Sequence, residues 1–190
     1  MSSLMHSALG AAFEQLPAAL QAHYKAGPTR ESGHLDIEYP RWMQPFLTLL
    51  RLVGALVNRA GRQVPTLVEK WDSAQGQQWR RTISFSNGKV VYFNSRWVKG
   101  EGNRLIEYVN PLLGLEMAVH VEGGNLYYEG VRFIVKLGAL LIPIPEWLLL
   151  GHTTIVEEGV DANHFAMDFR LTHPVFGQIF RYAGTFEVVP

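Results

Sequence analysis

Cysteine is absent from the 190 residues of this sequence. Disulfide bonds, thiolate nucleophiles and cysteine-based zinc or iron–sulfur sites are therefore excluded. Charge is also scarce, at 18% of residues, and 17 basic and 17 acidic side chains leave a formal net charge of +0. Because nucleic-acid binding normally leaves a basic footprint, and Arg80-Arg81 is too small a cluster to supply one, we expect no nucleic-acid partner.

Motifs for common chemistry are missing as well. The sequence contains no Gly-x-Ser-x-Gly nucleophile elbow, no Gly-x-Gly-x-x-Gly turn after a strand and no phosphate-binding loop. None of the histidines has a metal-binding spacing on a helix, although His152 and His164 lie on strands that we expect to pair. We therefore expect no bound metal and no cofactor. The missing motifs also weigh against an enzyme, but they leave that question open.

Long apolar runs are limited to two segments. Residues Phe46–Val57 and Leu137–Leu150 are both shorter than the roughly 20 residues of a membrane-spanning helix. The first ten residues do not form a secretion signal, because no basic cluster precedes an apolar run. The sequence thus predicts a soluble, cytoplasmic protein without a transmembrane segment.

Helical periodicity is confined to the first third of the chain. Apolar residues at three- and four-residue spacings predict a helix over Ala8–Tyr24, with a break at Pro17. Alternation predicts a short strand over His34–Tyr39. A second helix, about Arg41–Arg59, has an unusually wide apolar surface, which is typical of a helix buried on most sides by a sheet.

Beyond Val64 the hydrophobic period changes to two, the period of β-strands. Asn87-Gly88 is a strong signal for a tight hairpin between two of these strands. Further strands are expected at about Arg104–Val109, Leu115–Val121, Asn125–Val135, His152–Glu158, Asn163–Leu171 and Gln178–Val188. Closely spaced strands without intervening helices indicate an antiparallel meander.

These elements predict an α+β fold that is mostly β. We expect a strongly curved antiparallel meander, or incomplete barrel, of about eight or nine strands wrapped around the N-terminal amphipathic helix in a helix-grip arrangement. Residues 1–190 would form one domain. It comprises a helical segment over 1–33, a short strand and long apolar helix over 34–60, and the meander over 64–190.

Several short motifs together resemble a family. They are Trp79-Arg80-Arg81, Asn87-Gly88, Leu105-Ile106-Glu107, Leu137-Gly138, Ile142-Pro143-Ile144-Pro145, Pro174-Val175-Phe176-Gly177 and Tyr182-Ala183-Gly184. In order and spacing, from about Leu16 to the C-terminus, the chain resembles the bacterial domain-of-unknown-function family 4166. The resemblance implies no activity. Members occur alone or fused behind saccharopine-dehydrogenase-like oxidoreductases, which implies an oxidoreductase as a partner.

Charged residues on apolar strand faces are the first candidates for a site. Arg81 shares a face with Trp79 and Ile83, Arg132 shares one with Ile134, and Glu69 lies between Leu67 and Trp71. A charge that points inward must be paired, and Glu107 on a neighbouring strand is the candidate partner of Arg81. Such a group could hold a polar ligand head or form a structural ion pair.

Aromatic residues along the strands are the second group of candidates, because they line apolar ligand pockets and also pack ordinary cores. The apolar segment 137–150 could cover such a pocket, contact a partner or second copy, lie on a membrane or fold into the core. The predicted ligand-binding residues are Trp71, Trp79, Arg81, Phe93, Trp97, Glu107, Arg132 and Trp147.

Three functions follow. The first is binding of an apolar or amphipathic small molecule in a cavity between sheet and helix. The second is a protein-interaction or accessory role for the 137–150 segment, including a homodimer. The third is acid–base catalysis on a small molecule by Glu69, Glu107 or Asp168.

Overall fold

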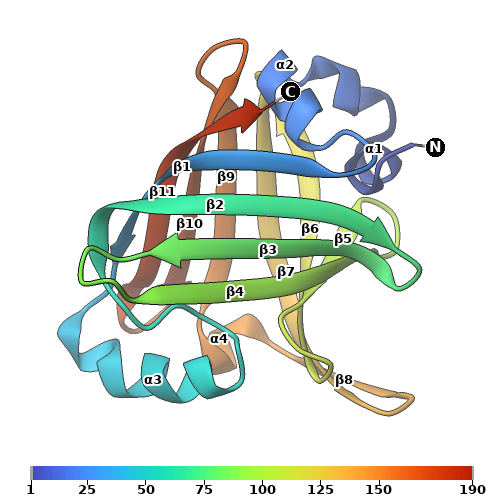
Figure 1. The fold of residues 1–190 in the computed structure, drawn as a ribbon. Helices are drawn as coiled ribbons and strands as arrows, with labels where there is room; N and C mark the ends of the chain where they lie inside the picture. Colours follow the sequence, from blue (N-terminus) through green and yellow to red (C-terminus); the bar gives the residue numbers. More distant parts are fainter. Residues whose placement is uncertain (1, 190) are drawn as a thin grey trace.

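The computed structural model describes residues 2–189 and consists mainly of strands that close on themselves (Figure 1). In the described chain the strands follow the order β6-β5-β4-β3-β2-β1-β11-β10-β9-β7-β8, and β6 also pairs with β7. The β6–β7 pairing closes ten strands into an antiparallel barrel, and β8 is an extra strand on β7. The expected mostly β, antiparallel α+β fold is confirmed. The expected incomplete barrel of eight or nine strands is wrong.

The strand bounds agree well with the alternating pattern of the sequence. They are β1 Thr29–Glu38, β2 Gly61–Ser73, β3 Gly76–Ser84, β4 Val90–Lys99, β5 Arg104–Tyr108, β6 Leu113–Glu122, β7 Asn125–Leu137, β8 Leu140–Ile144, β9 His152–Gly159, β10 His164–His173 and β11 Gly177–Val189. The hairpin at Asn87-Gly88 joins β3 to β4, as predicted, and Gly88 has a φ of 78°. Strand β8 was not predicted, because its run is apolar throughout and has no alternation.

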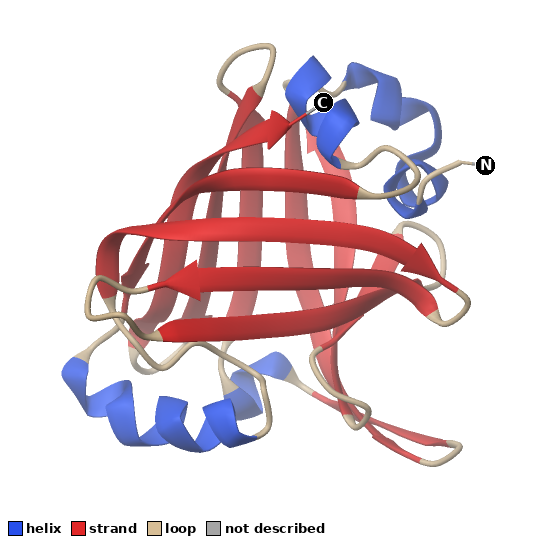
Figure 2. Cartoon of the chain, viewed as in Figure 1, coloured by secondary structure: helices blue, strands red, loops and turns tan. Residues whose placement is uncertain are grey.

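Helices cover the two ends of the barrel and do not enter it (Figures 1 and 2). The predicted helix over 8–24 is divided into α1 Leu4–Leu9, the 3₁₀ turn η1 Gly10–Gln15 and α2 Ala18–His23, with Pro17 directly before α2. The second predicted helix is shorter than expected, with the 3₁₀ turn η2 Arg41–Met43 followed by α3 Gln44–Leu52. A short helix, α4 Glu146–Leu149, lies near α3 at the same end.

The barrel is therefore not wrapped around a helix. In α3 the side chain of Leu47 is buried, but Leu49 and Leu52 are exposed by 61% and 81%. The prediction that this helix is buried on most sides by the sheet is wrong, because much of its apolar surface faces solvent. Side chains from the strands fill the barrel interior instead, and the largest fully buried ones include Tyr128, Lys70, Phe180 and Met117.

Barrel closure brings β1 and β11 unusually close together at a glycine. Gly184 pairs with Leu35 in the β1–β11 ladder. A Cβ atom on Gly184 would lie 2.0 Å from the backbone oxygen of His34. Because backbone atoms of a paired strand cannot move aside, the position admits only glycine.

We expect Gly184→Ala to lower the free energy of unfolding by about 3 kcal/mol or more through overpacking. The control is Thr185→Ala, one residue away on an exposed position, which should cost less than about 1 kcal/mol. Urea denaturation of both variants measures the difference. Equal stabilities would show that the β1–β11 contact is not a constraint.

Candidate functional site

The barrel interior contains an ion pair between strands β3 and β5. Alternation turns Trp79, Arg81 and Ile83 of β3 inward. The Arg81 Nη1 atom lies 3.3 Å from Glu107 Oε1 and 3.1 Å from Ser95 Oγ of the intervening strand. The two charged side chains are exposed by only 14% and 10%. The predicted Arg81–Glu107 pair is therefore present and largely removed from water.

Aromatic rings flank the guanidinium group. Its carbon lies 5.1 Å from the centre of the Phe93 ring and 5.7 Å from that of Trp79. Burial lowers the pKa of Arg81, but the charge and hydrogen bond of Glu107, together with Tyr182 and Tyr24, outweigh burial and raise that pKa above its ordinary value. Arg81 is thus a fixed positive charge in an apolar interior, stabilised by one carboxylate and two ring faces.

A second polar group lies deeper in the barrel. The Tyr24 hydroxyl, just after α2, lies 2.7 Å from Glu157 Oε2 of β9 and hydrogen-bonds the hydroxyl of Tyr128 on β7. Burial raises the pKa of Glu157. Burial also raises the pKa of Tyr24 and of Tyr128, and the charge of Glu157 raises both further. This triad was not predicted from the sequence, although Glu157 alternates inward with Ile155 and Thr153 on β9.

A void of about 40 Å³ separates the two polar groups. Arg81, Glu107, Glu157, Trp79 and Trp97 are among its lining residues. The two indole rings lie 5.6 Å apart, and both Nε1 atoms are buried without a hydrogen-bond partner in residues 2–189. A buried N–H group normally has an acceptor, so both indoles can still donate a hydrogen bond inside the barrel.

Two further regions of free space extend the void toward the end covered by α3 and α4. Their volumes are about 20 and 60 Å³, and Phe93 and Tyr182 line both of them. Leu56, after α3, and Leu150, after α4, lie on the wall of the larger one. The interior thus changes from charged near Arg81 to apolar near this end.

Another buried charged cluster lies at the opposite end, under α2. The Nδ1 atom of His23 is 3.1 Å from Glu31 Oε1, close but not aligned for a hydrogen bond. The Lys70 ammonium donates to the backbone oxygens of His23 and Lys25, at 2.8 and 2.6 Å. Burial lowers the pKa of Lys70 to about 8. These contacts fasten the chain after α2 to β2.

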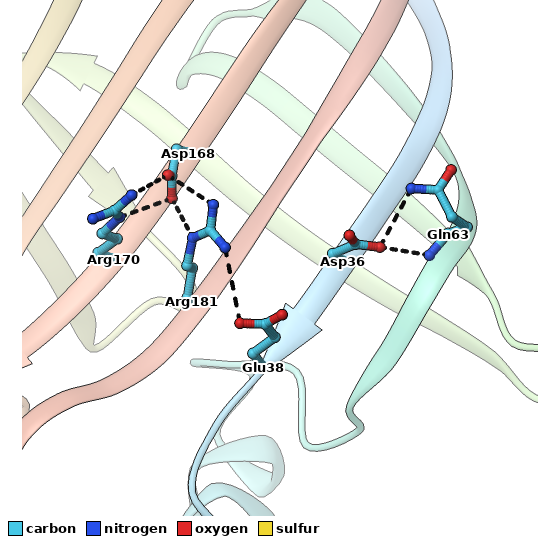
Figure 3. Close-up of polar contacts among 6 residues, drawn as sticks. All are labelled: Asp36, Glu38, Gln63, Asp168, Arg170 and Arg181. Atoms are coloured by element: carbon cyan, nitrogen blue, oxygen red, sulfur yellow. Dashed lines mark hydrogen bonds and ion pairs between the residues drawn. The ribbon is translucent and has the colours of Figure 1, made fainter.

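An open groove of about 690 Å³ lies over the outer face of β1, β11, β10 and β9. Asp168 there accepts hydrogen bonds from Arg170 and Arg181, and Arg181 also pairs with Glu38 (Figure 3). Burial raises the pKa of Asp168, but the hydrogen bonds and charges of the two arginines together outweigh burial and lower that pKa to about 2. The charges of Asp168, Arg170 and Arg181 in this groove therefore already satisfy one another.

Backbone strain marks one edge of this groove. Gln63 has a φ of 49°, and its N–H donates to Asp36 Oδ1 at 2.6 Å (Figure 3). The register of β1 and β2 shifts between Leu35 and Ile37, so Gln63 occupies a β-bulge. The Asp36 contact stabilises this conformation, and the bulge has a structural explanation within the sheet.

The structure brings five of the eight predicted site residues together in the interior: Trp79, Arg81, Phe93, Trp97 and Glu107. Trp71 lies on the outer face of β2 beside the guanidinium of Arg80, at 5.4 Å. Arg132 pairs with Glu116, and Trp147 is 61% exposed on α4. A ligand-binding role stays a prediction for all eight, and the last three cannot share one cavity with the first five.

The residues proposed for acid–base chemistry are also separated. Glu107 lies in the barrel interior. Glu69 lies opposite the exposed Arg80 in the β2–β3 ladder, and Asp168 lies in the outer groove. His152 and His164 lie on paired strands, but at opposite ends of the β9–β10 ladder. His152 instead lies between Glu146 and Glu129, at 2.7 and 2.8 Å.

No group of three or more histidine, aspartate or glutamate side chains in residues 2–189 is arranged to hold a metal ion. No helix in the same range is long and apolar enough to cross a membrane.

The fold and its interior define the class: a closed antiparallel β-barrel, compatible with a ligand-binding cavity, with charged and aromatic side chains inside. The chain belongs to the family described as domain of unknown function (DUF4166), whose model matches residues 16–186. It is also similar to the uncharacterized protein YndH of Bacillus subtilis (strain 168), with 26% identity over 118 residues.

That match covers 59% of this chain and 56% of the relative, so the chain spans little more than half the length of YndH. No solved structure matches the chain. The predicted family is confirmed, whereas the fusion to oxidoreductases stays a prediction.

We expect each of Arg81→Met and Glu107→Leu to lower the free energy of unfolding by about 3–5 kcal/mol, because each leaves a buried charge without its partner. The double variant should recover most of this loss, since two apolar side chains need no counter-charge. Urea denaturation of the three variants measures the coupling. A double variant whose loss equals the sum of the two single losses would contradict this and show that the two charges do not stabilise each other.

The lowered pKa of Lys70 predicts how stability depends on pH. The folded state binds fewer protons than the unfolded state between the folded value of about 8 and the ordinary 10.5. The free energy of unfolding should therefore rise by about 2 kcal/mol from about pH 7.5 to about pH 9.5. Lys70→Met should abolish the rise and exposed Lys99→Met should keep it. A rise that persists in Lys70→Met would assign it to another group.

Proposed function

We infer that the barrel interior binds a small amphipathic molecule, with its polar head near Arg81 and its apolar part toward the α3 and α4 end. The head should accept hydrogen bonds, because two residues that line the void, Trp79 and Trp97, have indole N–H groups without an acceptor in residues 2–189. Such chemistry fits a carboxylate, carbonyl or similar oxygen-bearing head. We propose that binding takes place in the cytoplasm, the location predicted from the sequence.

The observation that carries the proposal is the pair of buried indoles. Trp79 and Trp97 line the same void as the Arg81–Glu107 pair, and their Nε1 atoms have no hydrogen-bond partner in residues 2–189. A core that served stability alone would gain by apolar residues at these positions, because an unsatisfied buried donor costs about 1–3 kcal/mol. An acceptor oxygen between the indoles and Arg81 would satisfy all three donors at once.

The volumes impose a requirement on the proposal. The interior spaces are about 40, 20 and 60 Å³, whereas pockets for drug-sized ligands span roughly 300–1,000 Å³. A ligand must therefore displace side chains, and Phe93 and Tyr182 stand between the spaces. Entry requires the end covered by residues 53–57 and α4 to open, because Leu56 and Leu150 form the wall there.

We expect decanoate to shift the indole N–H resonances of Trp79 and Trp97 in a two-dimensional NMR spectrum. Decylamine, which has the same chain but a cationic head that repels Arg81, should shift them far less. Trp71, on the outer face of β2, supplies the internal control.

Two matched variants test where the probe binds. Phe93→Trp adds volume between the interior spaces and should abolish the decanoate shifts, whereas Tyr92→Trp adds the same ring on the exposed neighbour and should keep them. Shifts of equal size for both probes, or in both variants, would contradict binding at Arg81.

The alternative of acid–base catalysis now has a better candidate residue than those named from the sequence. Glu157 borders the void, and burial raises the pKa of its carboxyl group, as a general base near neutral pH requires. The Tyr24 and Tyr128 contacts are equally explained as a structural network. Catalysis, and an accessory role beside an oxidoreductase, stay predictions.

A further inference from the structure

Exposed apolar side chains gather at one end of the barrel. They belong to α3, the β7–β8 hairpin, α4 and the turn between β10 and β11, and these segments lie at the same end of the barrel (Figures 1 and 2). The exposed fractions are 81% for Leu52, 59% for Leu140, 61% for Trp147 and 77% for Val175. Large apolar side chains exposed together mark an interaction surface rather than ordinary surface variation.

Contacts join these segments into one surface, here called the apolar end. The rings of Trp42 and Phe176 lie 5.3 Å apart and link the start of α3 to the β10–β11 turn. The side chain of Asn110 donates to the oxygen of Val53, and the Lys136 amide donates to Leu112. These bonds connect the end of α3, the β5–β6 loop and the hairpin.

The charges of the apolar end that have no ion-pair partner in residues 2–189 are all positive. Its segments are residues 41–59, 109–112, 131–149 and 174–177, and their charged residues are Arg41, Arg51, Arg59, Arg132, Lys136 and Glu146. Glu146 is buried with its carboxylate on His152, and Arg132 pairs with Glu116. The other four basic residues form no ion pair among residues 2–189. The chain has zero formal net charge, so this is a local asymmetry.

We propose that the apolar end docks on the surface of an anionic lipid bilayer. Apolar side chains would enter the boundary between headgroups and acyl chains, and the basic residues would contact acidic headgroups. Trp42 and Trp147 belong to the residue type that is enriched at such interfaces. The protruding hairpin and helix suit insertion better than they suit a groove-binding peptide.

A second copy of the chain is the less suitable occupant. A symmetric dimer through this surface would bring the same four unpaired basic residues of each copy together, and like charges oppose association. An anionic bilayer supplies both the apolar phase and the opposite charge.

The proposal does not depend on the ligand function, although the two share one end of the barrel. Leu56 and Leu150 line the interior space nearest to the apolar end. A docked barrel would therefore present the entrance of its apolar interior to the lipid.

Flotation with vesicles tests the proposal on the full chain. We expect binding to vesicles of phosphatidylcholine with phosphatidylserine, weaker binding in high salt, and at least tenfold weaker binding to phosphatidylcholine alone.

Leu148→Ser with Trp147→Ser should lower the affinity by at least tenfold, while Val160→Ser, equally exposed in the β9–β10 loop, should not. Each of Arg41→Gln and Lys136→Gln should lower it by about fivefold, and Lys99→Gln should not.

Circular dichroism shows whether each variant remains folded, and the substituted residues are exposed or half-buried. No binding to either vesicle, or equal effects of the control variants, would overturn the proposal. Sedimentation that shows a dimer dispersed by Leu148→Ser would overturn it in favour of self-association. Vesicle binding is measured without any interior ligand, so its failure leaves the decanoate experiment unaffected, and the reverse also holds.

Discussion

The pairing of β6 with β7 is the constraint on which the rest of the structure depends. It joins the first six strands to the last five over the register from Leu113–Val135 to Glu122–Asn125. Without it the sheet would be open and its concave face would be wet. With it, Arg81, Glu107 and Glu157 lie in an enclosed interior, where an unpaired charge is costly and every polar contact is strengthened. Closure of the barrel therefore brings the inward-facing residues of the alternating strands into one enclosed site.

The strands could be predicted almost completely from the sequence, because alternation and turn residues are local signals. The Asn87-Gly88 hairpin and the break at Pro17 are examples. Closure could not be predicted, since nothing local in β6 or β7 distinguishes a barrel from a long meander. The same limit explains α3: a wide apolar surface predicts burial, and only the tertiary structure shows Leu49 and Leu52 exposed.

The candidate site was predicted in part for a related reason. Arg81 and Glu107 are charged residues within strongly alternating strands, so their inward direction and mutual pairing could be inferred. Trp71 and Arg132 occupy outward positions, and one residue of register decides the face. Tyr24 and Glu157 are 133 positions apart in the sequence. Their contact depends on α2 covering one end of the barrel, which no sequence pattern indicates.

The two proposals assign separate roles to the two unusual features of the molecule. The interior has donors without acceptors beside a fixed charge, and the apolar end has exposed hydrophobic side chains beside unpaired basic residues. Neither arrangement is expected from stability alone, because apolar residues inside and polar residues outside would be more stable. The more central of the two proposals is that the barrel interior binds an amphipathic molecule.

Native mass spectrometry of the freshly purified protein, followed by organic extraction and identification of the released compound, tests that claim most directly. The account predicts a bound amphipathic molecule with an oxygen-bearing head, present in the wild type and absent from Phe93→Trp. A clean protein mass under conditions that preserve weak complexes, together with no compound released, would contradict it and make the aromatic interior an ordinary core.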